Sequence, residues 1–289
     1  MKISILIPVY NDWESVSELI KNIDIEIKDL NHEFSIIIIN DASLEKKELN
    51  FQSLENINLI ELIHMKENRG HARCNAFGIR YIFLNKEFDY IILMDGDGED
   101  RPVEIKSLVK KINENPNVSV VAKRVKRSEG PFFQLLYQAH KLITVIFTGK
   151  NIDFGNYSIL TKVDAGKLHS KASLWSSFSG SVKKYLTPLN EINSFRGSRY
   201  FGPSKMSFFK LIIHSLSIIA VFKYQVFLRS TLIIIALAYL NLYLGSLSVF
   251  LQILIVIFNL LIFVASRREL EKDLINSQNN LSEIKNITH

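Results

Sequence analysis

An acidic segment follows a short apolar run near the middle of the first half of the chain, and residues 93–100 read LMDGDGED. Side chains alternate along an extended chain, so Asp95, Asp97 and Glu99 are expected to point to one side. The two glycines between them let the backbone turn and let a ligand approach closely. Mg²⁺ or Mn²⁺ bound to a nucleotide diphosphate would neutralise carboxylates gathered in this way. The segment therefore predicts a metal site made of these three residues.

Two other interpretations apply to this segment. An EF-hand calcium loop also begins with D-x-D, but counted from Asp95 its glycine position is Asp100 and its final glutamate position is Lys106, which excludes it. A solvated acidic turn without a ligand remains open. Asp100 breaks the alternation and lies just before Pro102, so it is expected to cap the next helix.

Polar residues also follow two other apolar runs. The first run of the chain leads into Tyr10, Asn11 and Asp12, and the second leads into Asp41. Tyr10 is suited to stacking on a base, and Asp12 to a hydrogen bond with it. Each is ambiguous alone, because Asn11 or Asp12 serves equally well as a helix cap and Asp41 as a turn residue. Three acidic strand ends together favour a ligand site.

These runs belong to an alternation of strand and helix signals. Apolar residues recur at helical spacing between residues 16 and 30, and Pro102 suits the first turn of a helix. Apolar strands separated by helices predict an α/β fold, a mostly parallel sheet covered by helices, in which ligands bind at the carboxyl ends of strands. The expected strands are residues 3–9, 34–39, 59–63, 90–94, 118–122 and 152–160, and the expected helices include residues 71–84 and 131–150.

The C-terminal third is far more apolar than the rest of the chain. Residues 211–222 predict an interfacial helix. Residues 226–244 and 249–265 predict two transmembrane helices joined by a short uncharged loop, each close to the ~30 Å hydrocarbon thickness at ~1.5 Å per residue. Lysine and arginine flank this hairpin on both sides, so the positive-inside rule places both termini in the cytoplasm. Two buried helices of a soluble core are the competing interpretation.

Composition narrows the class of protein further. Cys74 is the single cysteine among 289 residues, which excludes an internal disulfide and indicates a reducing compartment. The N-terminus lacks the basic region and the long apolar core of a signal peptide. The net charge of +6 suits anionic lipid or phosphate ligands, and the apolar C-terminal third favours lipid over nucleic acid as a partner.

Four motifs occur in a recognisable order: SILIPVYND, IIIINDAS, NRGHARCNAFGI and ILMDGDGEDRP. In this order they resemble the family 2 glycosyltransferases of the GT-A (Rossmann-like) fold, above all the polyprenyl-phosphate branch that includes dolichol-phosphate mannose synthase. The later segment RGSRYFGPSKMSFFKL resembles the juxtamembrane region of that branch. The resemblance implies a metal-dependent, inverting transfer from a nucleotide-diphosphate sugar to a polyprenyl phosphate at the cytoplasmic leaflet of the inner membrane. It also implies a role in cell-envelope glycan synthesis and allows a homo-oligomer.

Carried over by motif position, the resemblance implies three groups of site residues. The nucleotide sugar would contact Pro8, Tyr10, Asp12, Asp41, Asp95, Gly96, Arg199 and Lys205. The acceptor phosphate would meet Arg124 and Arg127, while Asp95, Asp97 and Glu99 would hold Mg²⁺ or Mn²⁺, with Glu99 in place of the usual glutamine. Asp95, Asp97 and Arg124 would act directly in catalysis. The basic segment KRVKR at 123–127 has a competing interpretation as a solvated face that binds anionic lipid.

One segment departs from the family pattern. Where many relatives read Asp-Phe-Arg, this chain has Asn156-Tyr157-Ser158, so a carboxylate considered as a base and an arginine near the acceptor phosphate are both missing. A lipid phosphate is already anionic and attacks without a base, whereas a hydroxyl acceptor needs one. Transfer to a hydroxyl of a lipid-linked glycan, with Asp153 or Asp100 as base, is therefore an alternative. A non-catalytic, membrane-tethered sugar-nucleotide sensor is another.

The chain is thus expected to consist of four parts. Residues 1–203 would form the cytoplasmic GT-A catalytic domain and residues 204–225 a juxtamembrane interfacial region. The two transmembrane helices would lie within residues 226–266. The polar tail at 267–289 is expected to be cytoplasmic and partly helical, with no activity assigned to it.

Overall fold

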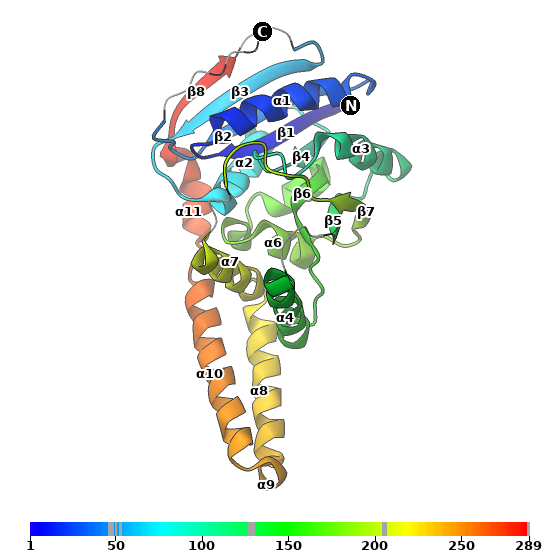
Figure 1. Ribbon diagram of the computed structural model, residues 1–289. Coiled ribbons are helices and arrows are strands. Elements are labelled where there is room, and N and C mark those ends of the chain that lie inside the picture. Colours follow the sequence, from blue (N-terminus) through cyan, green and yellow to red (C-terminus); the bar gives the residue numbers. More distant parts are fainter. Residues whose placement is uncertain (46–48, 50, 52–53, 127–130, 204–206, 288–289) are drawn as a thin grey trace.

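A computed structural model describes residues 1–45, 49, 51, 54–126, 131–203 and 207–287. Its central feature is an eight-stranded sheet (Figure 1). The strands are β1 (Lys2–Val9), β2 (Glu33–Asn40), β3 (Ile57–Met65), β4 (Tyr90–Leu93), β5 (Val120–Lys126), β6 (Phe154–Thr161), β7 (Asn190–Phe195) and β8 (Leu281–Ile287). They lie in the order β7-β5-β6-β4-β1-β2-β3-β8.

The central part of this sheet is parallel and its flanks are mixed. β1 pairs in parallel with β2 and β4, and β2 pairs in parallel with β3. β6 runs antiparallel to both β4 and β5, and β8 runs antiparallel to β3. The carboxyl ends of β1, β2, β3 and β4 therefore meet at one edge of the sheet, where ligands of α/β proteins bind.

Helices cover both faces of the sheet, as the apolar strands predict. The face with α1 (Trp13–Ile27) and α3 (Ile105–Glu114) takes Ile5 and Ile7 of β1 into its core. The opposite face, with α2 (His71–Asn85), α5 (Lys162–Leu168) and α6 (Phe178–Tyr185), takes Leu6. Because β1 is buried on both sides, its sequence after Lys2 is apolar rather than alternating, except for Ser4, whose hydroxyl bonds that of Ser35 on β2.

A helical hairpin extends away from the sheet domain, with α9 at its far end (Figure 1). The helices of this region are α4 (Pro131–Thr148), α7 (Phe208–Ala220), α8 (Lys223–Tyr239), α9 (Asn241–Leu244) and α10 (Ser246–Ser266). Among the described residues, α10 is long and apolar enough to cross a membrane, whereas α7 and α8, bent by 87°, meet that criterion only together. Exposed apolar side chains such as Leu232 and Leu254 line the hairpin. The structure thus contains the expected hairpin, and length and composition support one span directly.

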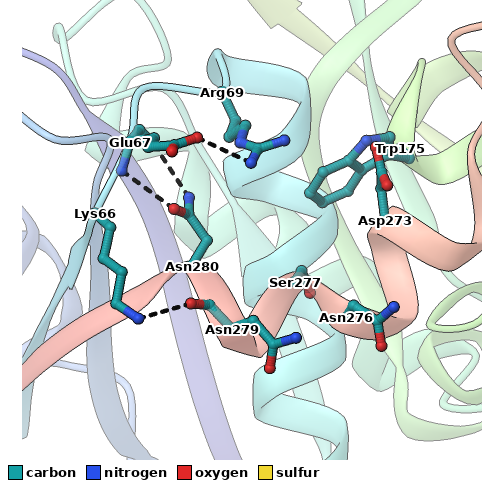
Figure 2. Close-up of a pocket in the computed structure, with 9 residues that line it drawn as sticks. All are labelled: Lys66, Glu67, Arg69, Trp175, Asp273, Asn276, Ser277, Asn279 and Asn280. Atoms are coloured by element: carbon teal, nitrogen blue, oxygen red, sulfur yellow. Dashed lines mark hydrogen bonds and ion pairs between the residues drawn. The ribbon is translucent and has the colours of Figure 1, made fainter.

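The C-terminal tail returns to the sheet domain. The Lys223 ammonium and the Glu269 carboxylate lie 3.1 Å apart at the base of the hairpin. Beyond them, α11 (Glu271–Ile275) precedes a 3₁₀ turn and then β8. The tail is partly helical, as expected, but its last segment is an edge strand that the sequence analysis missed. The tail and the loop after β3 border a pocket of about 280 Å³ (Figure 2).

Candidate active site

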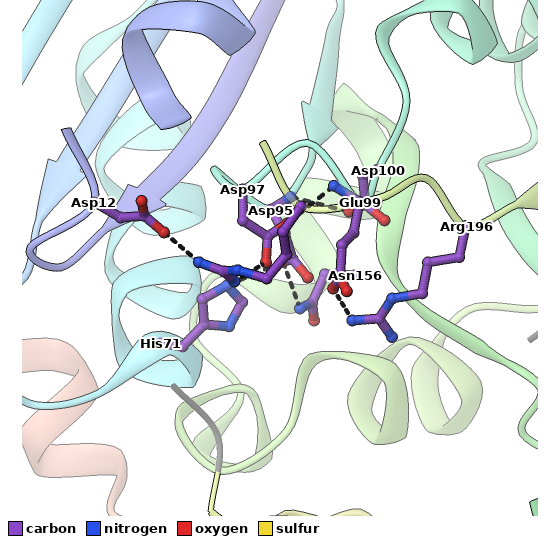
Figure 3. Close-up of polar contacts among 9 residues, drawn as sticks. Asp12, His71, Asp95, Asp97, Glu99, Asp100, Asn156 and Arg196 are labelled. Carbon is purple, nitrogen blue, oxygen red and sulfur yellow. Dashed lines mark hydrogen bonds and ion pairs between the residues drawn. The ribbon is translucent and has the colours of Figure 1, made fainter. Parts of the chain in front are cut away.

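Residues 94–100, here called the acidic loop, follow the end of β4 at Leu93 and lie at the carboxyl edge of the parallel strands (Figure 3). Asp95 is held from two other elements. Its Oδ1 lies 3.0 Å from Nε2 of His71, the first residue of α2, and accepts a hydrogen bond of 3.1 Å from Nδ2 of Asn156 on β6. The loop therefore presents a carboxylate whose position is fixed by a helix and a strand.

The extended conformation from which Asp95, Asp97 and Glu99 were expected to share one side is absent here. The strand stops before Asp95 and the chain then turns, with Gly98 at a φ of +88°, so extended alternation does not apply. Asp97 accepts from the Glu99 amide at 3.0 Å and from Arg199 Nη1 at 2.6 Å, and Glu99 is paired with Arg196. The described residues contain no ready-made group of three His, Cys, Asp or Glu side chains around a metal position. The metal assignment stays a prediction.

Asp100 does not cap the next helix, contrary to expectation. Its Oδ2 accepts a hydrogen bond of 2.9 Å from the Asp95 amide, and the helical turn that begins at Pro102 has no side-chain cap. Asp100 is buried and closes the acidic loop on itself. Its role in the structure is to set the conformation from which Asp95 projects.

A segment after β7 covers the acidic loop. The Gly197 amide donates to the Glu99 carbonyl at 2.8 Å, and the Tyr200 amide donates to the Asp97 carbonyl at 3.0 Å. The Tyr200 ring packs so tightly on Gly98 that a Cβ there would lie 2.6 Å from Cε2. Two main-chain bonds and this close contact explain why the loop needs a glycine at position 98.

Arg199 links the acidic loop to the end of β1. Its guanidinium bonds Asp97 through Nη1 and Asp12 through Nη2. Asp12 stands at the N-cap position of α1 but makes no side-chain cap there, so the capping interpretation of Asp12 is wrong. Two residues predicted separately for the donor site, Asp12 and Arg199, are thus brought together. Lys205 and Arg127 lie outside the described residues.

Crowding and burial shift the titration of the acidic loop. Burial and the neighbouring Asp95 charge raise the pKa of Asp97 to about 6, and the same two causes raise the pKa of Asp100 to about 7. Burial alone would raise the pKa of Asp95, but the charge and hydrogen bond of His71, together with Arg124 and Asn156, outweigh it and hold that pKa well below the usual range. Burial likewise opposes the charged form of His71, yet Asp95 raises its pKa. A bound cation would favour the ionised form of these two carboxyl groups, so the acidic loop suits a cation ligand.

The remaining nucleotide-side predictions lie along the ends of β1 and β2. Tyr10 is exposed and Pro8 belongs to β1. Asn11 accepts from the Leu44 amide at 2.8 Å, so it fixes the neighbouring loop instead of capping α1. Asp41 is buried and accepts from the amides of Arg69 and Gly70, each at 2.8 Å.

The basic segment at 123–127 begins on β5, which extends further than the predicted strand at 118–122. The Arg124 guanidinium lies over Gly155, where a Cβ would come within 2.6 Å of Nη2. This places Arg124 beside Asn156 and within electrostatic reach of Asp95. Lys123 pairs instead with Asp153 at 3.1 Å, so the carboxylate considered as an alternative base is engaged in an ion pair.

Three residues that contact the acidic loop had no predicted role: His71, Arg196 and Tyr200. All three lie inside the motifs that carry the family resemblance, NRGHARCNAFGI and RGSRYFGPSKMSFFKL. Motif membership was therefore the available signal. Their partners could not be read from the sequence, because the contacts join segments far apart in the chain.

Comparison with known proteins finds similarity to glycosyltransferases. The model for glycosyl transferase family 2 matches residues 4–178. The chain is 26% identical over 219 residues to the undecaprenyl-phosphate 4-deoxy-4-formamido-L-arabinose transferase of Proteus mirabilis, and 27% identical over 218 residues to that of Photorhabdus laumondii. Each match covers 73% of this chain, which spans 64% and 65% of the length of the two relatives.

A solved structure with a similar fold is glucosyl-3-phosphoglycerate synthase of Mycobacterium tuberculosis, in complex with Mn²⁺, UDP-glucose and phosphoglyceric acid. The TM-score is 0.52 at 14% sequence identity, over 78% of this chain and 79% of that one. At this identity the likeness is one of fold. It confirms the predicted α/β architecture.

Proposed function

Because the chain belongs to glycosyl transferase family 2, we propose that it moves a sugar from a nucleotide-diphosphate donor to a polyprenyl phosphate at a membrane surface, with inversion at the anomeric carbon. The two curated relatives carry undecaprenyl phosphate in their names, which supports a polyprenyl acceptor. The observation that carries the proposal is the convergence of Asp12, Asp95 and Asp97, from the ends of two parallel strands, on one edge of the sheet.

The donor would lie along this edge. Pro8, Tyr10 and Asp12 would line the base, with Asp41 beside them. Arg199 already contacts Asp12 and Asp97, and a bound diphosphate between these residues would gain its charge-assisted hydrogen bonds. Lys205 would add a second cation to the diphosphate. Gly96 lets the acidic loop pack closely on the end of β1, since a Cβ there would lie 3.0 Å from the Pro8 carbonyl oxygen.

The residues of the acidic loop fit a divalent cation, Mg²⁺ or Mn²⁺. Burial and the crowding of negative charges raise the pKa values of two carboxyl groups there, and Arg196 and Arg199 serve as counterions. Asp95, Asp97 and Glu99 would hold the cation, which would offset negative charge on the departing nucleoside diphosphate. Glu99 would have to exchange Arg196 for it.

The acceptor phosphate would meet Arg124, with Arg127 as a second contact. One of its oxygens would attack the anomeric carbon in line, while the bond from that carbon to the diphosphate breaks and its electron pair moves to the leaving oxygen. An anionic phosphate needs no general base, which agrees with Asn156 where many relatives have a carboxylate. Asp95, positioned by His71 and Asn156, would face the reacting sugar.

Membrane attachment would serve this reaction by holding the site where a lipid acceptor is confined. α10, with α8 beside it, would span the inner membrane and α7 would lie at its surface. The arginines and lysines on both sides of the hairpin would keep the sheet domain and the tail in the cytoplasm.

One alternative function has an observation in its favour. Asp100 has a pKa raised to about 7 by burial and by Asp95, a value that suits a general base for a hydroxyl acceptor. Its Oδ2, however, is engaged by the Asp95 amide. Transfer to a hydroxyl of a lipid-linked glycan would need this bond to open.

A donor screen with the purified full chain tests the proposal. Release of nucleoside diphosphate is measured for a panel of nucleotide sugars, with either undecaprenyl phosphate or an oligosaccharide lipid as acceptor and with or without Mn²⁺. The lipid product is identified by mass. We expect one donor to react, only with the divalent cation present. Transfer to an oligosaccharide lipid but not to undecaprenyl phosphate would favour the hydroxyl acceptor. No transfer from any donor would favour the sugar-nucleotide sensor.

A further inference from the structure

The C-terminal tail extends the β3–β8 ladder into the loop that joins β3 to α2. The last paired residues are Met65 and Leu281. Beyond them, the Lys66 amide donates to the Asn280 carbonyl at 2.7 Å. The Asn280 side chain then bonds Glu67 twice: Oδ1 accepts from the Glu67 amide and Nδ2 donates to the Glu67 carbonyl, each at 3.1 Å (Figure 2). A side-chain amide can pair in this way because it carries the same donor and acceptor as a peptide unit.

The other end of the same loop is hydrogen-bonded to Asp41, which follows β2. The amides of Arg69 and Gly70 both donate to its carboxylate, and Gly70 reaches this geometry at a φ of +90°, which favours glycine. The loop at 66–70 is therefore fixed at two points, by Asp41 at the end of β2 and by Asn280 in the tail. Asp41 in turn is the buried carboxylate expected beside the nucleotide base.

Residues 66–69 of this loop are exposed, so hydrogen bonds rather than buried side chains of the loop hold it against the tail. The pocket of about 280 Å³ lies between them, bordered by Glu67 and Arg69 on one side and by Trp175, Asp273 and Ser277 on the other (Figure 2). An open pocket leaves the loop room to move when its hydrogen bonds are lost. The Asn280 amide is thus the attachment on this side, together with the Lys66 ammonium, which donates to the Asn279 carbonyl at 2.9 Å.

We infer that Asn280 is a positioning residue for donor binding, acting through the loop at 66–70 on Asp41. The inference rests on the proposed function, in which Asp41 lines the nucleotide subsite. Ligand affinity scales with the fraction of molecules whose site is correctly arranged, so loosening the loop lowers donor affinity while leaving the acidic loop and the chemical step intact. The tail, which follows the membrane hairpin, thereby completes the donor side of the site.

The test compares Asn280→Ala with Asn279→Ala in the full-length chain. The contact of Asn279 is made by its backbone carbonyl, so alanine at 279 keeps it. With about 1 kcal/mol lost from the two amide bonds, we expect about a fivefold rise in donor KM and in the dissociation constant for the nucleoside diphosphate, with kcat unchanged. Asn279→Ala should match wild type in all three.

A second variant separates the loss of the amide from the loss of side-chain volume. Asn280→Asp keeps the oxygen that accepts from the Glu67 amide but sets a carboxylate oxygen against the Glu67 carbonyl, so its nucleotide affinity should be at or below that of Asn280→Ala. A kcat that falls with KM unchanged, or equal nucleotide affinity in Asn280→Ala and wild type, overturns the inference while leaving the proposed function in place. A wild-type chain that binds no nucleoside diphosphate by calorimetry overturns the proposed donor site and the role of Asn280 with it.

Discussion

The guanidinium of Arg199 joins Asp12 to Asp97, two carboxylates that follow different strands of the sheet. Arg199 lies only 16% exposed between them, so both carboxylates share one mostly buried positive charge. An arrangement of this kind holds the base side and the metal side of the proposed site at a fixed separation. It also marks where the diphosphate of a donor would compete for the same cation.

Replacing Arg199 should therefore damage catalysis. We expect Arg199→Ala to lower kcat/KM for the donor by about 100-fold, the usual cost of one preorganised charge donor. Arg199→Lys should recover only part of this loss, because an ammonium lacks the planar fork that reaches two carboxylates. Steady-state kinetics with the identified donor measure both variants. Full activity in Arg199→Ala would contradict the role assigned to it.

Stability should depend on pH through the acidic loop. The pKa values of Asp97 and Asp100 are raised from 3.8 to about 6 and about 7. From pH 3.8 up to the raised pKa of each group, the folded state therefore binds more protons than the unfolded state. Stability therefore falls as pH rises across this window. The raised pKa of His71 acts in the same direction above 6.5, whereas the stabilising effect of Asp95 is lost only below 3.8.

The measurement is the thermal midpoint in detergent, without divalent cations, from about pH 5 to about pH 8. We expect the midpoint to fall over this range in wild type and to fall less in Asp97→Asn, which removes one of the titrating groups. Mn²⁺ should stabilise wild type most at the high end, where the carboxylates are ionised. A midpoint that rises with pH would show that these carboxylates titrate otherwise.

Restoring a carboxylate at position 156 should not improve the enzyme. Asn156 donates to Asp95 at 3.1 Å, and Asn156→Asp replaces that donor with a second acidic group against Asp95. Losing the bond and leaving its partner unsatisfied should lower transfer to the lipid phosphate about tenfold. Asn156→Ser, which removes the amide without adding charge, is the control. Faster transfer to a hydroxyl acceptor in Asn156→Asp would instead support the alternative function.

The hairpin and the tail make a topological prediction. β8 pairs with β3, so the end of the tail must lie on the same side of a membrane as the sheet domain, while α9 lies at the far end of the hairpin. Cys74 is buried, so new cysteines can be labelled against a low background. In sealed vesicles, an impermeant thiol reagent should reach Asn241→Cys and Glu283→Cys from opposite sides. Labelling of both from one side would exclude a spanning hairpin.

The sequence predicted the buried parallel strands well, because a strand covered on both faces is largely apolar, as in β1 and β2. It failed at two kinds of place. The alternation of Asp95, Asp97 and Glu99 required an extended chain, which ends at Leu93. The strand at 281–287 is exposed along most of its length, so its pattern is polar and its pairing with β3 depends on a contact across nearly the whole chain.

The positions of Asp12 and Asp41 were predictable, because each directly follows a strand that ends at the same edge of the sheet. The partners of the acidic loop were not, because Arg196 and His71 reach it from the segment after β7 and from the start of α2. Tertiary pairing of charges leaves no periodic signal in the sequence. The same limit applies to Asn280. Its proposed role depends on the loop at 66–70, which is far from it in the sequence.

The pairing of β8 with β3 also bears on how the protein is made. A ribosome releases β3 long before β8, with the whole hairpin between them in the chain. Until the tail has emerged, β3 remains an open edge able to pair with other chains. If the hairpin spans a membrane as proposed, completion of the sheet domain would be coupled to its insertion, and a nascent chain stalled before its last strand would carry an unpaired β3 edge.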